Sequence, residues 1–66
     1  MQRELVIKLD GKGVDDDAGF ILVYRCGDHV SLVASAEKNG DAEIVLDQAG
    51  VASLCGALQG LLRKRP

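Results

Sequence analysis

Hydrophobic and polar residues alternate over most of the first two thirds of the chain, which predicts a β-sheet. We expect strands at residues 4–9, 20–26, 29–36 and 41–46. Every second side chain in such a stretch reaches the same face of a sheet, so Leu5, Ile7 and Leu9 are expected on one side of the first strand. The stretch 20–26 is apolar at nearly every position, which is typical of a central strand covered on both faces.

Turn signals separate these stretches. Gly27-Asp28 and Asn39-Gly40 are typical of two-residue hairpin loops, in which the turn residues must tolerate positive φ. Successive hairpins predict an antiparallel meander. Residues 10–19 contain three glycines and four aspartates and therefore predict a solvated loop between the first two strands.

The last part of the chain has the periodicity of a helix. One apolar stripe recurs at three- and four-residue spacing and consists of Val51, Leu54, Cys55, Leu58, Leu61 and Leu62. Asp47 is a suitable N-cap, because its carboxylate accepts hydrogen bonds from free backbone N–H groups. We expect the helix to end near Lys64. Residues 1–66 are thus expected to form one small α+β domain: a four-stranded antiparallel meander, followed by one C-terminal helix as the second layer (β-β-β-β-α).

Two-residue loops at both turns determine which residues share a face of the sheet. One face then carries Phe20, Leu22, Tyr24, Val33, Ile44 and Leu46. The other face carries Ile21, Val23, Val30, Leu32, Ala34 and Val45. Both faces are apolar, and one helix covers only one of them. We expect it on the face with the bulkier Phe20, Leu22 and Leu46. A longer turn would slip a strand and exchange its faces.

The second face is expected to be an interface, because large uncovered apolar patches are unusual on monomers and mark interaction sites. The helix offers another surface, since small residues on one side permit close approach of a second backbone and residues 48–62 carry no charge. A helix that is merely rich in Ala and Gly is the alternative interpretation. We expect a homodimer that completes the fold through Ile21, Val23, Leu32, Ala34, Val45, Ala52, Gly56 and Gly60.

Composition disfavours several kinds of partner. The net charge of −2 and the presence of only two aromatic residues, Phe20 and Tyr24, argue against nucleic acid and anionic membranes. No apolar run approaches the roughly 20 residues of a membrane span. The sequence shows neither a disulfide-rich cysteine pattern nor a signal peptide. We therefore expect Cys26 and Cys55 to be reduced thiols in a cytoplasmic protein, with a single disulfide bridge between them as the alternative.

Three short clusters carry chemically useful residue types without a full motif. Cys26 and His29 flank a turn and could bind a metal together with Cys55 and an aspartate, although a structural zinc site needs four well-spaced ligands. The segment 15–17 is all aspartate but lacks the alternating ligands of a calcium loop. The basic run 63–65 suits a helix C-terminus better than a phosphate site. We therefore expect no catalytic, cofactor-binding or metal residues and no enzymatic activity.

Two classes of function remain in competition. The first is a non-enzymatic interaction or regulatory module that forms a homodimer and binds another protein. The second is single-stranded nucleic-acid binding. The β-β-β-β-α order resembles the fold of the single-stranded-DNA-binding transcription-coactivator family, which implies a dimer that grips the strand on basic, aromatic-bearing sheets. That resemblance lies in element order and assigns no binding residues. A third possibility, an enzyme, would need a site built across a dimer interface.

Overall fold

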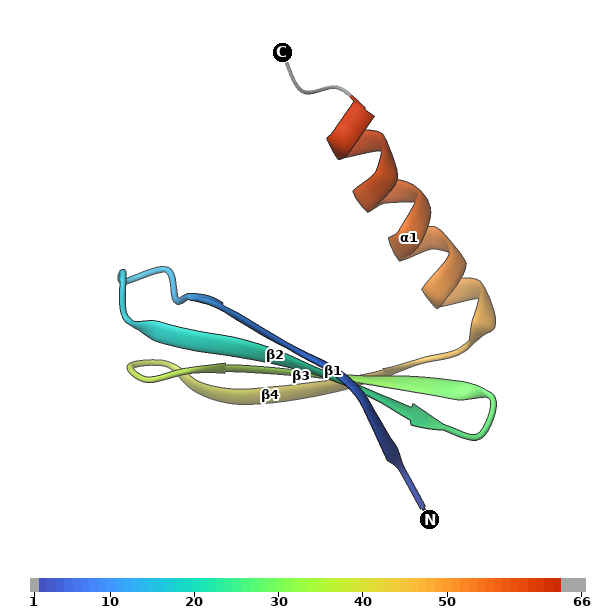
Figure 1. Ribbon diagram of the computed structural model, residues 1–66, viewed down its shortest axis with the longest axis horizontal. Coiled ribbons are helices and arrows are strands. Elements are labelled where there is room, and N and C mark those ends of the chain that lie inside the picture. The colour runs from blue at the N-terminus through green and yellow to red at the C-terminus, as the bar shows by residue number, and fades with distance from the viewer. Residues whose placement is uncertain (1, 64–66) are drawn as a thin grey trace.

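The structure, a computed structural model that describes residues 2–63, contains a four-stranded sheet followed by one helix (Figure 1). The elements are β1 (Glu4–Lys12), β2 (Ala18–Cys26), β3 (His29–Ala36), β4 (Gly40–Leu46) and α1 (Gln48–Arg63). Each strand pairs antiparallel with the next, in the order β1-β2-β3-β4. The expected α+β meander with a C-terminal helix is therefore confirmed.

Strands β1 and β2 are longer than the hydrophobic pattern indicates. Gly11 lies opposite Gly19 and Lys12 lies opposite Ala18, so the ladder continues into the segment that we expected to be a loop. The reason is that backbone pairing does not depend on side-chain hydrophobicity, and it continues here through residues that are typical of a loop. The loop itself is reduced to residues 13–17.

A β-bulge interrupts β1 and changes which residues share a face. The register shifts between Leu5 and Ile7. Leu5 lies opposite Tyr24, whereas Ile7 lies opposite Val23, and successive residues of β2 point to opposite faces. The expectation that Leu5 lies on the same side as Ile7 is therefore wrong, because the extra residue of a bulge inverts the alternation.

The turn between β2 and β3 has the expected length. Cys26 lies opposite His29, which leaves Gly27 and Asp28 as a two-residue loop. Gly27 adopts a φ of 61°, as the first position of a type II′ turn requires. The predicted pairing of β2 with β3 is confirmed along its whole length.

The turn between β3 and β4 is one residue longer than expected. Ala36 lies opposite Gly40, and the Asn39 N–H donates to the Ala36 carbonyl at 3.2 Å. Gly40, with a φ of 79°, follows that turn. This is the usual three-residue hairpin loop, in which a type I turn is followed by a left-handed glycine at a bulge. Gly40 is therefore the first paired residue of β4 and lies just after the type I turn.

The longer turn exchanges the two faces of β4. Ile44 lies opposite Leu32 and Leu46 lies opposite Val30, whereas Val45 lies opposite Ser31. The predicted faces are therefore right for β2 and β3 but wrong for Ile44, Val45 and Leu46. We call the side with Leu32 the apolar face; its apolar side chains are Ile7, Leu9, Ile21, Val23, Val30, Leu32, Ala34, Ala42, Ile44 and Leu46.

We call the opposite side the mixed face, because apolar, aromatic and charged side chains alternate on it. Its members include Leu5, Lys8, Asp10, Phe20, Leu22, Tyr24, Ser31, Val33, Ser35, Asp41, Glu43 and Val45. The two faces therefore differ much more in polarity than the sequence alone suggests.

Helix α1 leaves the sheet instead of covering it. Its start is confirmed: the Gly50 N–H donates to Asp47 Oδ1 at 2.8 Å and the Val51 N–H donates to the Asp47 carbonyl at 3.0 Å. The helix then rises away from the strands (Figure 1), and none of residues 48–63 is buried. The expectation that the helix stripe packs on Phe20 and Leu22 is wrong. Part of the predicted C-terminal turn, Lys64 and Arg65, lies outside the described residues.

The single chain has no hydrophobic core in residues 2–63. The buried side chains there are polar, namely those of Asp17 and Ser31. The accessible area is 5365 Å², whereas a folded monomer of this mass exposes about 4,000 Å². The radius of gyration is 13.3 Å, against about 11 Å for a compact domain of this length. Within the same residues, no helix is long and apolar enough to cross a membrane.

Candidate functional site

The apolar face is organised in two rows that cross all four strands. The first row is Ile7, Val23, Leu32 and Ile44, and the second is Leu9, Ile21, Ala34 and Ala42. Opposed residues in an antiparallel sheet lie within side-chain contact of each other. Each row is therefore a continuous apolar band across the sheet.

Four of the predicted interface residues meet on this face. Ile21 lies opposite Ala34 and Val23 lies opposite Leu32. Val45, which we expected beside them, lies on the mixed face because of the longer turn. The sequence analysis missed Ala42, Ile44 and Leu46 for the same reason. The preference of a left-handed glycine for the position after a type I turn was the signal that could have placed them.

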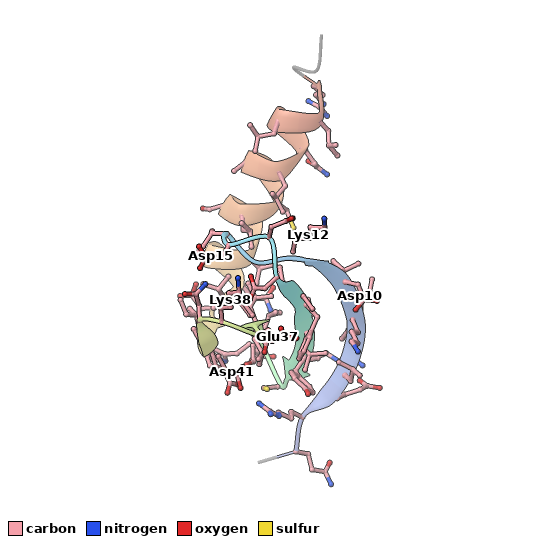
Figure 2. The ribbon with its side chains drawn as sticks, turned by 90° about the vertical axis from the view of Figure 1, so that its left-hand side faces the viewer. Asp10, Lys12, Asp15, Glu37, Lys38 and Asp41 are labelled. Carbon is pink, nitrogen blue, oxygen red and sulfur yellow. The ribbon has the colours of Figure 1, made fainter. Side chains whose placement is uncertain are left out.

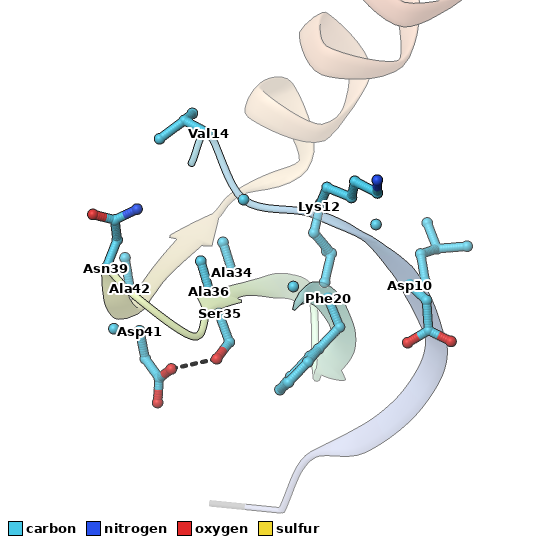
Figure 3. A pocket seen from close by; sticks show the side chains of 16 residues that line it. Asp10, Lys12, Val14, Phe20, Ala34, Ser35, Ala36, Asn39, Asp41 and Ala42 are labelled. Atoms are coloured by element: carbon cyan, nitrogen blue, oxygen red, sulfur yellow. Dashed lines mark hydrogen bonds between the residues drawn. The ribbon is translucent and has the colours of Figure 1, made fainter. Parts of the chain in front are cut away.

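The apolar face has a hollow of about 480 Å³ at its end remote from the helix (Figure 3). The side chains of Ala34, Ala36 and Ala42 point to the side of the sheet from which the helix rises. Val14, in the loop between β1 and β2, lies over the hollow. Leu9 and Ile21 complete the apolar lining. Small side chains on the strands create this hollow, since alanine leaves space that a larger residue would fill.

Polar side chains cover part of the mixed face. Arg3 Cζ lies 4.1 Å from the centre of the Tyr24 ring, and Lys8 Nζ lies 5.0 Å from the centre of the Phe20 ring. The long aliphatic stems of these cations cover the apolar surface below them. Ser35 Oγ donates to Asp41 Oδ1 at 2.5 Å on the same side (Figure 3). Leu5 and Val45 on this face nevertheless remain 52% and 57% exposed.

Glu43 is the centre of a polar cluster on the mixed face. Arg3 Nη1 donates to Glu43 Oε2 at 2.7 Å, and the buried Ser31 hydroxyl donates to the same oxygen. The hydrogen bond from Ser31 is the largest cause that lowers the pKa of Glu43 below its ordinary value of 4.5. Desolvation opposes it, and the positive charge and hydrogen bond of Arg3 lower the pKa further. The cluster holds a carboxylate in its charged form and ties residue 3 to β4.

The acidic loop is attached to the β3–β4 turn at one end of the molecule, where Asp15, Lys38 and Asp41 lie near one another (Figure 2). The backbone N–H of Lys38 donates to Asp17 Oδ2 at 2.6 Å, and Asn39 Nδ2 donates to Asp15 Oδ2 at 3.3 Å. Asp16 forms an ion pair with Lys12 at 3.0 Å. Asp17 is buried, whereas we expected a solvated loop. Its carboxylate accepts a hydrogen bond from a backbone N–H of the neighbouring turn, which holds it in this position.

Cys26 and His29 lie opposite each other across the β2–β3 turn, as expected. Cys26 and Cys55 are free, the first half-buried and the second exposed on the helix. Residues 2–63 contain no group of three or more His, Cys, Asp or Glu side chains that could hold a metal ion. A Cβ atom added at Gly56 or Gly60 would meet nothing within 4 Å, and Ala52 is exposed, so the small-residue side of the helix is open in the single chain.

None of the protein-family models, curated proteins and solved structures compared with the chain matches it. The inference of function therefore rests on the uncovered apolar face and the projecting helix.

Proposed function

We propose that this chain is a non-enzymatic interaction module that acts as a homodimer, in which the apolar face of each subunit is buried by the second copy. The single observation that carries this proposal is the row Ile7, Val23, Leu32 and Ile44, a band of apolar side chains across a sheet that its own helix does not cover. Burying apolar area contributes about 25 cal/mol per Å². Covering this face therefore stabilises the fold by an amount comparable with the whole stability of a small domain.

The excess exposed area of the chain matches the area that a stable homodimer buries. The chain exposes 5365 Å², which is about 1,300 Å² more than a compact monomer of its mass. Two subunits that each hide this excess would bury about 2,600 Å² together, within the range of obligate homodimers and above that of transient contacts.

The character of the surface also favours a second copy over a charged partner. The two apolar rows contain no charged residue, and Arg25, at their margin, is already paired with Glu4. Obligate homodimer interfaces are similarly depleted of charge at their centre. A two-fold dimer would present two mixed faces to the outside, where a further protein can bind. Free thiols at Cys26 and Cys55 fit a reducing, cytoplasmic location.

Light scattering after size exclusion, at low and high micromolar concentration, tests the proposal. We expect a mass of about 14 kDa, twice the 7.0 kDa of one chain, at both concentrations. A mass of 7.0 kDa throughout the series would overturn it.

Single-stranded nucleic-acid binding is the second candidate, and one observation favours it. Phe20 and Tyr24 lie on the same face of the sheet with Lys8 and Arg3 beside their rings, and aromatic rings with nearby cations suit stacking of unpaired bases. Acidic side chains, including Glu43, share that face and oppose a phosphate backbone. Fluorescence anisotropy with a labelled single-stranded oligonucleotide at low and high salt separates the candidates, because only this function predicts salt-dependent binding.

A further inference from the structure

The connection between β4 and α1 is too short and too well held for the helix to lie on its own sheet. Only Asp47 separates the two elements, and it accepts two backbone hydrogen bonds from the first turn of the helix. Gln48 Nε2 also donates to the Asp28 carbonyl at 2.5 Å, which ties the helix start to the β2–β3 turn. A Cβ atom at Gly50 would lie 3.3 Å from the Leu46 side chain, so the junction is closely packed. These contacts hold the direction of the helix.

The apolar stripe of the helix becomes more exposed with distance from this junction. The exposed fraction is 39% at Leu54, 52% at Leu58 and 67% at Leu61. The sheet thus covers the start of the stripe and leaves its end in water. Burial of leucine side chains in such a row would be strongly stabilising, but their own subunit does not bury them.

The helix and the apolar face fit each other in size and shape. Sixteen residues of helix measure about 24 Å, and the eight residues of β3 measure about 27 Å, so one helix can cross one sheet. The hollow beside Ala34 and Ala42 offers space for large side chains. The helix rises on the side to which these alanines point (Figure 3), which is the side that a second sheet would occupy.

We propose that each subunit lays its helix across the apolar face of the other subunit, reciprocally, with Leu58 and Leu61 directed to the hollow beside Ala34. This arrangement rests on the proposed homodimer and specifies it further. Short connections favour such an exchange of an element between copies, because the same element cannot reach its own subunit. The competing arrangement stacks the two apolar faces directly on each other and leaves the helices outside.

Cross-linking between differently tagged, co-expressed full-length chains distinguishes the two arrangements. Both chains carry Cys26→Ser; one keeps Cys55, and the other carries Cys55→Ser with Ala34→Cys. We expect a short bismaleimide to join the two different chains through Cys55. The matched control replaces Ala34→Cys with Ser35→Cys. Ser35 is the next residue of β3 and lies on the mixed face, so this variant should give no cross-linked product.

The outcomes separate the two levels of the proposal. A dimer whose Ala34→Cys chains link to each other, and not to Cys55, overturns helix exchange and leaves the homodimer standing. A chain that is monomeric by light scattering overturns both.

Lengthening the connection is an independent test. Six Gly and Ser residues inserted between Leu46 and Asp47 keep the helix cap but let the helix reach its own sheet at millimolar effective concentration. We expect the mass at low micromolar concentration to fall twofold, to that of one chain of the variant. The same six residues inserted between Gln2 and Arg3, outside the strands and the hollow, should leave the dimer intact. Equal dimerisation of both insertion variants would overturn the exchange.

Discussion

Leu32 and Ile44 lie directly opposite each other on β3 and β4, yet Ile44 remains 62% exposed. A cross-strand pair of this kind is stabilised by contact within the sheet, but its outer surface is shielded only by a second layer. The single chain has no such layer over this pair. The predictions below follow from that geometry and from the contacts at both ends of the sheet.

Ile44→Asp should dissociate the dimer, because it places a charge in the buried apolar row. Loss of one isoleucine costs about 1.5–3 kcal/mol, and a two-fold dimer loses two, so the dissociation constant should rise at least about 100-fold. Leu32→Asp should also weaken association. Sedimentation equilibrium measures the effect.

Val45→Asp is the matched control for Ile44→Asp. Val45 is 57% exposed, almost as much as its neighbour, but lies on the mixed face. Its substitution should leave the dissociation constant within about twofold, because surface changes away from an interface have small effects. Equal dissociation by both variants would contradict the assignment of the faces.

Asp47→Ala should lower the free energy of unfolding by about 1 kcal/mol, because the Gly50 N–H loses its acceptor at the helix start. Asp47→Asn should stay within a few tenths of a kcal/mol of the native chain, since asparagine caps helices equally well. Urea denaturation at one fixed protein concentration measures both. A cost for Asn as large as that for Ala would show that charge, and not capping, matters here.

Gly13→Ala should destabilise the end of the sheet at which the acidic loop meets the β3–β4 turn. The added Cβ would lie 2.1 Å from Asp17 Oδ1 and 3.0 Å from the Ala36 Cβ, and Asp17 cannot move without losing its bond to Lys38. Overpacking of this kind costs about 1–3 kcal/mol.

Gly11→Ala provides the comparison, because a Cβ there meets nothing within 4 Å. Thermal or urea unfolding should place it within about 0.5 kcal/mol of the native chain. A stable Gly13→Ala chain would contradict the tight packing of the loop.

Glu43 should titrate below pH 4.5 in the folded chain, and its pKa should rise in Ser31→Ala. The hydrogen bond from Ser31 is the largest single cause of the lowered pKa. A depressed folded pKa contributes stability above the unfolded value of 4.5, and this contribution is lost as the pH falls through the folded pKa. Side-chain carboxyl NMR shifts across that range measure the titration, and an unchanged pKa in Ser31→Ala would contradict the assignment.

The sequence by itself determined the elements and their order. Period-two alternation predicted the strands, and the Gly27-Asp28 dipeptide predicted the register of β2 with β3, because a two-residue loop permits only one pairing. Asp47 predicted the start of the helix, since capping is a local interaction between neighbours in the chain. Ile21, Val23, Leu32 and Ala34 were correctly placed together for the same reason: their face depends only on local alternation and one short turn.

The tertiary structure alone decided the register of β4 and the position of the helix. Asn39-Gly40 is compatible with both a two-residue and a three-residue loop. The three-residue loop formed, and it places Val45 on the face opposite to the expected one. Burial of Asp17 against Lys38 joins segments distant in sequence. The leucine stripe of the helix predicts that one side of the helix is buried. It does not predict the surface that buries it, because the hydrophobic effect is non-directional. The one-residue connection at Asp47 directs those leucines away from their own sheet.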